Sequence, residues 1–298
     1  MQTTRRSNSR LSRFVRYGNW IFNPAHGLST SQVYDLIDRS SPTEKGLYLN
    51  LGYWKDAETM DSASDALAML VAEAGGMSGT DRVLDCGFGF GDQNLLWAER
   101  IGPQHIVGLN ITQTQVDAAR DRVLAAGQSE RIDLRHGSAT DMPIESGSVD
   151  LVISLESAFH YRSRDDFFRE AMRVLRPGGR LVTADILPMP PTGDRRNRRN
   201  QRIGWWVVAS KFLIPEENVY DIVEYRHRLA NAGFDVARLE SIRDDVYAPL
   251  HKHMQKHPER LSVLHPIARL PARLSLKWPP EDVYPGLDYI LAVGRKPG

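Results

Sequence analysis

RVLDCGFGFGD, residues 82–92, is the stretch that decides the fold of this 298-residue chain. Its first half is apolar and short, as expected of a buried strand that ends at Asp85. Three glycines, Gly87, Gly89 and Gly91, then follow at a spacing of two, before a stretch with helical character. Such a turn lets backbone N–H groups approach a ligand at the start of a helix without side chains in the way. The stretch therefore predicts a strand, a ligand-binding turn and a helix in succession.

The same alternation continues on both sides of this turn. We expect strands at residues 82–85, 105–110, 132–136, 149–154, 180–185, 234–242 and 287–295. We expect helices at residues 62–74, 93–101, 114–126, 164–175 and 220–232. Apolar β-rich runs that alternate with amphipathic helices are typical of a parallel sheet covered on both faces. The predicted fold class is therefore α/β, a doubly wound, mostly parallel sheet of seven strands.

Four parts of the chain differ in character. Residues 1–60 form an N-terminal helical arm or lid, residues 61–187 the regular core, residues 188–233 a cap inserted after the fifth strand, and residues 234–298 the last two strands with a polar, basic insertion between them. The arm carries the aromatic residues Phe14, Tyr17, Trp20 and Phe22. We expect these side chains to anchor the arm.

Composition narrows the function classes. A net charge of +1 gives no reason to expect a polyanionic partner, and 41% apolar residues are ordinary for a soluble protein. The single cysteine, Cys86, excludes an intrachain disulfide and suits a reducing cytoplasm. No apolar run reaches the ~20 residues that span a bilayer. The basic N-terminus could contact a membrane surface, although a solvated start is the simpler interpretation.

The glycine turn by itself leaves three interpretations open: a dinucleotide site, another nucleoside site, or a structural turn without ligand. Its third glycine comes one residue too early for the dinucleotide pattern G-x-G-x-x-G. Asp85 would also repel a pyrophosphate, whereas a cationic sulfonium ligand tolerates a carboxylate there. Both details favour a sulfonium nucleoside.

The motif VLDCGFGFGD resembles the first motif of class I, Rossmann-like S-adenosylmethionine-dependent methyltransferases. Asn110, Ile111 and Gln115 resemble the second-strand segment of their small-molecule branch, which includes natural-product sugar O-methyltransferases, cyclopropane fatty acid synthases and tocopherol or sterol methyltransferases. The resemblance implies S-adenosylmethionine as cofactor. Many class I enzymes hold the ribose with an acidic residue where this chain has Asn110. Asn110 and Gln115 are therefore the ribose candidates, although Gln115 could equally be a solvated helix residue.

The segment GSATDMP, residues 137–143, corresponds to the adenine-facing loop of that family, with Ser138 in place of its common acidic residue. Ala139 can contribute backbone, and either Ser138 or Asp141 could accept the adenine amino group. The resemblance thus implies a set of cofactor-binding residues: Asp85, Gly87, Gly89, Gly91, Asn110, Ile111, Gln115, Ala139, Thr140, Asp141, Leu155 and Tyr53.

Candidate catalytic residues follow the fourth and fifth strands, because ligands collect at the carboxyl ends of parallel strands. Glu156, His160 and Tyr161 follow the fourth strand, and Asp185 ends the fifth. A histidine with a pKa near ~6.5 suits proton removal from an alcohol, and Asp185 would orient it. Alternatively, Glu156 or Tyr161 could stabilise a cation formed from an alkene. Glu156 could also simply bind backbone N–H groups of its loop, and His160 could be a plain hydrogen-bonding residue.

Aromatic residues outside the core suggest an acceptor pocket. The segment LNLGYW, residues 49–54, resembles one that closes over the methionine part of the cofactor in the same branch, which places Tyr53 and Trp54 near the sulfonium. Trp205, Trp206 and Phe212 lie in the predicted cap and favour a lipophilic or ring-bearing acceptor. The alternatives are an aromatic staple for residues 53–54 and the cap's own core for the other three.

The function predicted from these features is methyl transfer to an oxygen or carbon of a small, fairly hydrophobic metabolite. The alternative is a non-methylating reaction, such as a cyclisation, by an enzyme that keeps the cofactor. A nucleic acid substrate is not expected, because the fourth strand ends in LESA rather than in an N/D-P-P-Y/F motif and the basic run 195–202 is short. We interpret His251, His253 and His257 as part of a solvated insertion, so no metal is expected.

Overall fold

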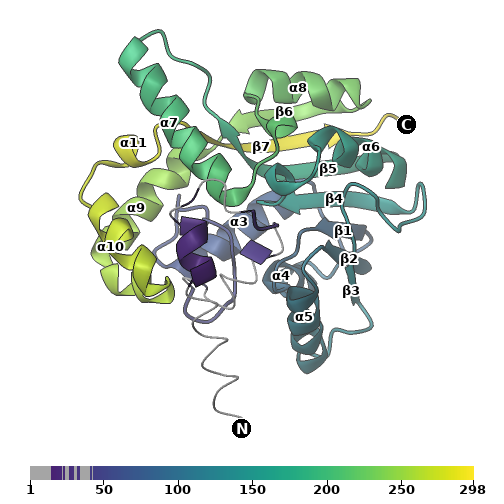
Figure 1. The fold of residues 1–298 in the computed structure, drawn as a ribbon. Coiled ribbons are helices and arrows are strands. Elements are labelled where there is room, and N and C mark those ends of the chain that lie inside the picture. The colour runs from purple at the N-terminus through teal and green to yellow at the C-terminus, as the bar shows by residue number, and fades with distance from the viewer. Residues whose placement is uncertain (1–14, 22, 24–26, 30–31, 34–40, 42) are drawn as a thin grey trace.

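The computed structural model describes residues 15–21, 23, 27–29, 32–33, 41 and 43–298. Its centre is a seven-stranded sheet with the order β3-β2-β1-β4-β5-β7-β6. The strands β1 to β5 pair in parallel, and β7 runs antiparallel to both β5 and β6. The predicted fold class is confirmed (Figure 1).

The seven strands lie close to where the apolar runs predict them. Their bounds are β1 Arg82–Cys86, β2 His105–Asn110, β3 Ile132–His136, β4 Val149–Leu155, β5 Leu175–Pro188, β6 Asp235–Ser241 and β7 Leu287–Arg295. Only β5 is much longer than predicted. It begins at Leu175 and its pairing with β4 shifts register between Val149 and Leu151.

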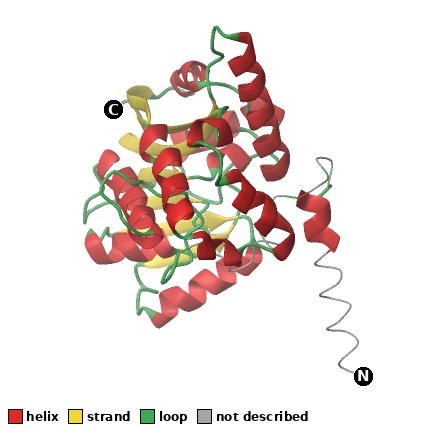
Figure 2. Ribbon diagram, turned by 90° about the vertical axis from the view of Figure 1, so that its left-hand side faces the viewer, coloured by secondary structure: helices red, strands yellow, loops and turns green. Residues whose placement is uncertain are grey.

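Helices cover both faces of the sheet (Figure 2). The helices α3 (Met60–Ala74), α4 (Asp92–Arg100) and α5 (Gln113–Ala125) pack on one face, against Val83, Ile106 and Ile153. The helices α6 (Arg164–Val174) and α8 (Ile222–Asn231) pack on the other, against Leu84, Val107 and Val152. Neighbouring residues such as Val83 and Leu84 point to opposite faces, so the parallel strands are apolar throughout.

A second group of helices lies at the carboxyl ends of the parallel strands. It consists of α7 (Arg195–Phe212), α9 (Tyr247–Lys256), α10 (Pro266–Ser275) and α11 (Pro280–Val283), and Figure 1 shows it at the left-hand edge of the sheet. The sequence predicts a connection at residues 188–200, but α7 already begins at Arg195. The Asp194 side chain caps it by accepting from the backbone N–H of Asn197, and no proline follows to interrupt it.

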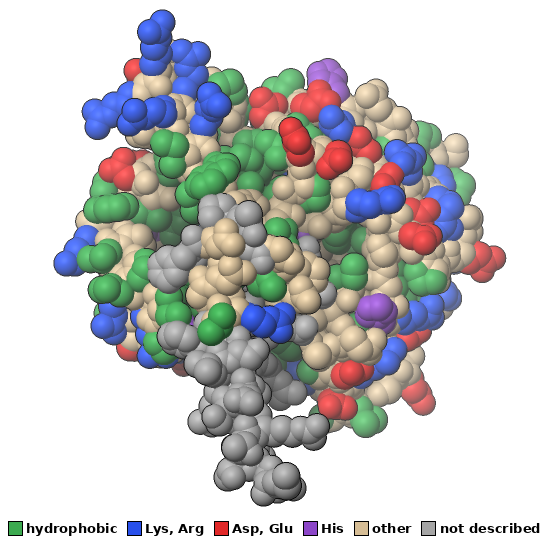
Figure 3. Space-filling view, viewed as in Figure 1, with side chains coloured by type: hydrophobic (Ala, Val, Ile, Leu, Met, Phe, Trp, Pro, Cys, Tyr) green, Lys and Arg blue, Asp and Glu red, His purple; other side chains and the backbone are tan. Residues whose placement is uncertain are grey.

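The first turns of α7 project from the body of the protein, and the arginines there form the blue group at the upper left of Figure 3. None of the described helices is both long and apolar enough to cross a membrane. In the predicted arm, Tyr17 and Trp20 are buried and pack together, whereas Phe14 and Phe22 lie outside the described residues. The basic residues 1–14, for which a membrane contact was considered, also lie outside them.

Candidate active site

A cavity of about 430 Å³ opens at the carboxyl ends of β1, β2, β4 and β5. It spans the point between β1 and β4 where the strand order reverses, which is where open α/β sheets bind ligands. The strap, which we define as residues 43–54, also contributes to the cavity wall, as do parts of α7, α9 and α11. Predicted residues that line it are Gly87, Gly89, Asn110, Ile111, Gln115, Ala139, Thr140, Leu155, Glu156, His160, Tyr161 and Phe212.

The glycine turn forms the floor of one end of the cavity. Gly87, Gly89 and Gly91 all have positive φ, of 88°, 58° and 81°. A Cβ atom on Gly87 would overlap the side chain of Ser157 from the loop after β4, so only glycine fits there. Gly91 does not line the cavity; it caps the N-terminus of α4.

Asp85 lies below this turn and not in the cavity wall, contrary to its predicted ligand contact. It is fully buried, and its Oδ2 accepts from Gln93 Nε2 at 3.1 Å and from Asn94 Nδ2 at 2.7 Å. Burial raises its pKa to about 7, although the two amide donors oppose that shift. Within the described residues, Oδ1 has no hydrogen-bond partner. Asp85 therefore ties the first turn of α4 to β1 and places a poorly solvated carboxyl beneath the glycines.

At the end of β2, two amide side chains form a directed pair. Asn110 Nδ2 donates to Gln115 Oε1 at 2.9 Å, while Asn110 Oδ1 accepts from the backbone N–H of Thr112. Gln115 is 5% exposed, and its Nε2 finds no partner in the described part of the chain. A buried, unpaired donor is costly. Gln115 therefore presents an N–H group that suits an oxygen of a ligand in the cavity.

The strap supplies a second donor of the same kind. Asn50 lines the cavity at 4% exposure; its Oδ1 accepts from the N–H of Gly52, and its Nδ2 has no partner among the described residues. Asn50 lies in the segment LNLGYW but is not among the residues predicted from the sequence. Its signal is the amide side chain in a segment that must cover a nucleoside site.

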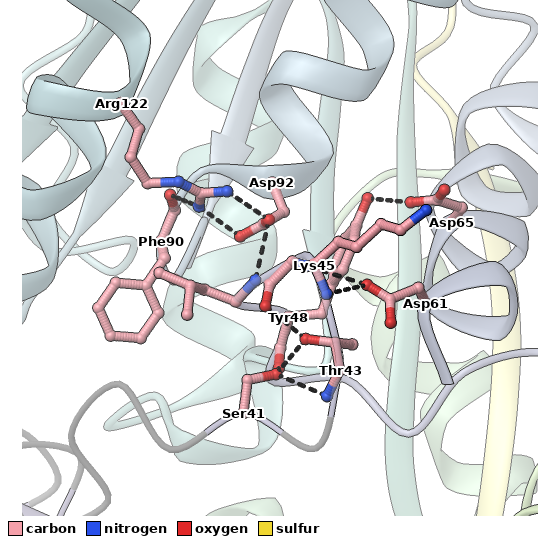
Figure 4. Close-up of polar contacts among 12 residues, drawn as sticks. Ser41, Thr43, Lys45, Tyr48, Asp61, Asp65, Phe90, Asp92 and Arg122 are labelled. Carbon is pink, nitrogen blue, oxygen red and sulfur yellow. Dashed lines mark hydrogen bonds and ion pairs between the residues drawn. The ribbon is translucent and has the colours of Figure 1, made fainter. Parts of the chain in front are cut away.

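Carboxylates hold the strap against the core (Figure 4). Asp92, the first residue of α4, accepts from the backbone N–H of Leu47 at 3.0 Å and pairs with Arg122 at 2.6 Å. Tyr48 donates to Asp65 at 2.6 Å, and Asp61 accepts from three successive backbone N–H groups at residues 44–46. The strap is thus fastened to the helices that flank the glycine turn, and Asn50 is fixed over the cavity.

The loop after β3 contributes Ser138, Ala139 and Thr140 to the wall of the cavity. Ser138 and Thr140 contact each other through their hydroxyl groups at 3.0 Å. Asp141, the other predicted adenine partner, is exposed and does not line the cavity. Of the two predicted adenine partners, Ser138 is therefore the one that lines the cavity.

His160 lies in a short 3-10 turn after β4 and faces the other end of the cavity. Its Nδ1 is 2.8 Å from the carbonyl oxygen of Phe212. Because a carbonyl only accepts, Nδ1 carries the proton and Nε2 carries the lone pair. Burial lowers the pKa of His160 to about 4, against a smaller opposing effect of the Phe212 carbonyl. The imidazole is therefore neutral near pH 7.

One partner of His160 is the end of a helix. Phe212 is the last residue of α7, and a helix C-terminus carries partial negative charge on carbonyls that lack intrahelical partners. That charge favours an imidazolium over a neutral ring. The helix end thus occupies the place beside Nδ1 where the sequence suggested a carboxylate.

Asp185, the expected partner of the imidazole, is bonded elsewhere. Its Oδ2 accepts from Arg164 Nε at 2.8 Å and its Oδ1 from the N–H of Ile186, and it does not line the cavity. Arg164 and Asp185 are both fully buried, so neither charge is viable without the other. Arg164 also donates to the carbonyl of Asn218, whose Nδ2 donates to the carbonyl of Tyr161 at 2.7 Å. Asp185 therefore supports the loop that carries His160 without touching the ring.

Glu156 has a structural set of partners. Its Oε1 accepts from the backbone N–H of Leu51 in the strap at 2.7 Å and from the hydroxyl of Tyr289 on β7 at 2.6 Å. Its φ of 47° is rare for a residue other than glycine. Burial raises its pKa to about 7, and the two donors oppose the shift. Glu156 fastens the strap to the sheet, which favours the structural interpretation of this residue.

Tyr161 is a brace within the same loop. Its hydroxyl donates to the carbonyl of Cys86 at 2.9 Å and lies within 3.1 Å of both Ser154 and Ser157. Burial raises its pKa well above the ordinary value, so the phenol stays protonated. The hydroxyl joins the end of β1 to the end of β4 and holds the glycine turn beside the His160 loop.

Four of the aromatic residues predicted near the ligand are not in the cavity wall. Trp54 is 6% exposed and packs on His253 of α9, with its Nε1 donating to the carbonyl of Leu51. Tyr53 donates to Asp245 in the short 3-10 turn before α9, so the two residues fasten the strap to this part of the chain. Trp205 fills the core beneath α7, and Trp206 is 56% exposed. Consecutive tryptophans on a helix point about 100° apart, so at most one can face the cavity side.

Sequence reasoning missed the rest of the acceptor end. Besides Phe212, this end consists of Val208 on α7, Tyr247 on α9, Val283 at the end of α11, Tyr284 directly after it, and Leu287 at the start of β7. Tyr247 and Tyr284 stack at 5.1 Å between ring centroids. The insertion between β6 and β7 therefore closes the cavity. No spacing in the sequence signals this, because the contributing segments meet only in the fold.

The histidines of α9 differ from the expected solvated insertion at one position. His251 is fully buried, with Nε2 2.9 Å from the carbonyl of Trp278, while His253 packs between Trp54 and His257. Within the described residues, no group of three or more potential ligands is placed to hold a metal ion.

Comparisons with known proteins identify the family to which this fold belongs. A family described as "Methyltransferase domain" matches residues 84–183. Erythromycin 3''-O-methyltransferase of Saccharopolyspora erythraea is 34% identical over 306 residues, which cover 98% of this chain and 99% of that protein. The 27-O-demethylrifamycin SV methyltransferase of Amycolatopsis mediterranei is 30% identical over 257 residues, 85% of this chain and 91% of its own length.

Among solved structures, the [4+2]-cyclase SpnF matches with a TM-score of 0.68 at 22% identity, over 90% of this chain and 96% of its own. Geranyl diphosphate C-methyltransferase from Streptomyces coelicolor A3(2) matches with a TM-score of 0.66 at 18% identity, over 90% and 100%. At these identities the likeness establishes the fold.

Proposed function

Since the chain belongs to the class I, Rossmann-like S-adenosylmethionine-dependent methyltransferases, we propose that it methylates a hydroxyl oxygen of a lipophilic, ring-bearing metabolite. Membership of this family decides between methyl transfer and a non-methylating reaction in favour of methyl transfer, with S-adenosylmethionine as cofactor. The choice of oxygen rests on the geometry of His160. The names of the two relatives, which methylate oxygen on erythromycin and rifamycin compounds, support it.

The cofactor end fits the nucleoside. When bound, S-adenosylmethionine supplies a methyl group on a positively charged sulfur, ready for in-line displacement. Gln115 Nε2 would donate to a ribose oxygen and Asn50 Nδ2 to an oxygen of the amino-acid part, which pairs two buried donors that otherwise have no partner in the described chain. Ser138 and the backbone of Ala139 would contact the adenine edge.

The contact of His160 Nδ1 with the carbonyl of Phe212, at 2.8 Å, is the single observation that carries the choice of an oxygen nucleophile. An alcohol must lose its proton as the new C–O bond forms, and His160 Nε2 has the lone pair that accepts it. The neutral imidazole is ready at pH 7, and the helix end at Nδ1 stabilises the positive charge that the ring gains. A carbon nucleophile would need no base until after the methyl group had moved.

The acceptor end fits a flat or ring-bearing molecule. Phe212, Tyr247 and Tyr284 present aromatic surface there, and Ile186, Val208 and Leu287 surround it with aliphatic groups. Such a wall excludes water from the reacting atoms, which favours alignment of nucleophile and methyl group. We expect the enzyme to act in the cytoplasm, because its one cysteine is buried and cannot form an intrachain disulfide.

The test is to incubate the enzyme with methyl-labelled S-adenosylmethionine and a panel of lipophilic hydroxylated compounds, small amines and prenyl alkenes. Label in the organic extract, located on oxygen by mass spectrometry and NMR, is the expected result. Label on carbon or nitrogen would contradict the proposed nucleophile. Label only in small polar acceptors would contradict the proposed substrate class.

A further inference from the structure

The end of α7 has two neighbours that are far apart in the sequence. Its last two residues, Lys211 and Phe212, each direct a backbone carbonyl beyond the helix. Lys211 O accepts from the indole Nε1 of Trp20 at 2.8 Å, and Phe212 O accepts from His160 Nδ1 at 2.8 Å. The terminal carbonyls of a helix lack intrahelical donors, so side chains have to satisfy them. Here one donor comes from the N-terminal arm and the other from the loop after β4.

The contact between Trp20 and Lys211 is reciprocal. Lys211 Nζ donates to the backbone carbonyl of Trp20 at 3.0 Å, so each residue is both donor and acceptor for the other. Trp20 is 7% exposed and lies in a small cluster with Tyr17 and Val33. Tyr17 in turn stacks on His265 at 4.2 Å, just before α10. The arm is therefore docked by directional bonds as well as by apolar contact.

Leu213, the residue after Phe212, is also held by the arm. Leu213 has a φ of 53°, a left-handed backbone conformation that residues other than glycine and asparagine rarely adopt. Its N–H bonds back to Ala209, and its side chain packs against the Tyr17–Trp20–Val33 cluster. The arm thus supplies contacts on both sides of Phe212 and restrains the backbone whose carbonyl holds the imidazole.

We infer that the N-terminal arm positions the imidazole of His160: Trp20 fixes the end of α7, so that the Phe212 carbonyl holds the proton on Nδ1. Trp20 is a positioning residue, since it contacts neither the cavity nor His160 itself. This inference goes beyond the proposed function and rests on it only where His160 is taken as the base.

The competing explanation is that Trp20 only adds stability. The two explanations differ in what happens to the ring, so the measurement is the tautomer of His160 in protein with ¹⁵N-labelled histidine. Long-range ¹H–¹⁵N correlation distinguishes a protonated from an unprotonated ring nitrogen, and the His160 signals are assigned by their loss in His160→Gln. The tautomer is measured on the full chain without any acceptor, and kcat is measured separately with an accepted hydroxyl substrate.

Trp20→Phe is the test variant, because it keeps an aromatic ring in the cluster and removes only the indole donor. Trp278→Phe is the control, since that tryptophan is 60% exposed and its side chain makes no hydrogen bond within the described chain. We expect the wild type and Trp278→Phe to hold the Nδ1–H tautomer. In Trp20→Phe we expect the Nε2–H form to rise several-fold, with a matching fall in kcat and an affinity for S-adenosylhomocysteine within twofold.

An unchanged tautomer in a folded Trp20→Phe protein would overturn the inference, as would an equal change in Trp278→Phe. Lys211→Met, which removes the return bond to Trp20, provides a second test if the first variant does not fold. A shifted tautomer without loss of methyl transfer would support the coupling and contradict the role of His160 as base. Failure of the inference is therefore distinguishable from failure of the proposed function.

Discussion

The two ends of the cavity are built in different ways. At the cofactor end, the glycine turn, Asn110, Gln115 and the loop at residues 138–140 follow β1, β2 and β3, each within a few residues of its strand. At the acceptor end, His160 meets Phe212 of α7, Tyr247 of α9 and Tyr284 from the segment before β7. Apart from the strap, the residues of the first end directly follow strands of the sheet, whereas the second end adds residues from inserted helices and from the segment before β7.

This difference indicates that the cofactor end of the cavity is a constant part of the fold, whereas the acceptor end varies with the substrate. Backbone geometry and buried amides dominate the cofactor end, and a nucleoside is the same ligand whatever the acceptor. Side chains on inserted helices dominate the acceptor end, where loops and insertions carry specificity on a constant scaffold. We therefore expect substitutions at the two ends to have separable effects on cofactor affinity and on turnover.

The largest effect is expected for Gly87→Ala. This substitution should reduce both cofactor affinity and turnover, because Gly87 belongs to the glycine turn and also lies against the loop that carries His160. Its Cβ would overlap Ser157 in the His160 loop, and its φ of 88° strains any side chain. Overpacking and strain together should lower the free energy of unfolding by roughly 3 kcal/mol and reduce both cofactor affinity and kcat at least ~100-fold. Urea denaturation and calorimetric titration with S-adenosylhomocysteine measure these effects.

The matched control is Gly127→Ala. Gly127 has a similar φ of 66° but open space around a Cβ, so it carries the strain without the overlap. It should lose about 1 kcal/mol of stability and keep its affinity for the cofactor. Equal losses in both variants would show that strain and not the approach of Ser157 makes glycine necessary.

Glu156→Gln tests the residue that fastens the strap to the sheet. The pKa of Glu156 is raised from 4.5 to about 7 by burial, so the folded state holds its proton more tightly than the unfolded state. Its contribution is fully present below pH 4.5 and is lost as pH rises through 7, by about 3 kcal/mol in all. Glutamine keeps the acceptor for Leu51 and Tyr289 but does not ionise.

The expected result is a wild-type stability that falls more steeply than that of Glu156→Gln between pH 4.5 and pH 8, measured by urea denaturation. Asp85 also has a raised pKa, but it is present in both proteins and cancels in the difference. Parallel pH profiles would mean that Glu156 stays ionised in the fold.

The smallest effect is expected at the cofactor end. Gln115→Met removes one N–H donor from the cavity, so the affinity for S-adenosylhomocysteine should fall about tenfold, while kcat at saturating cofactor stays within about twofold. Gln113→Met, on the same helix but exposed and bonded to Asp117, is the control. A loss of kcat without a loss of affinity would contradict the division of the cavity.

The same division explains what the sequence could predict. The strands β2 and β3 begin and end where the apolar runs do, because a parallel strand is buried on both faces. The pairing of His160 with a carboxylate was wrong, because Arg164 is fully buried and claims Asp185. That arginine looks like a solvated helix residue in the sequence. A backbone carbonyl such as that of Phe212 has no signature in the sequence at all.

The aromatic residues show the same limit. Trp54 and Trp205 were predicted near the ligand from residue type, but packing places the first against α9 and the second in the core. Tyr247 and Tyr284 reach the cavity because the start of α9 and the end of α11 both lie against it. Residue type suggests an apolar pocket, whereas only the tertiary arrangement says which aromatic residues form it.

The most direct test of the account compares wild type and His160→Gln on the same two scales, cofactor affinity and methyl transfer. With labelled S-adenosylmethionine and an accepted hydroxyl substrate, we expect kcat to fall by about 10²–10⁴ and the affinity for S-adenosylhomocysteine to stay within about twofold. An unchanged kcat would contradict the role of His160, and a parallel loss of affinity would contradict the separation of the two ends.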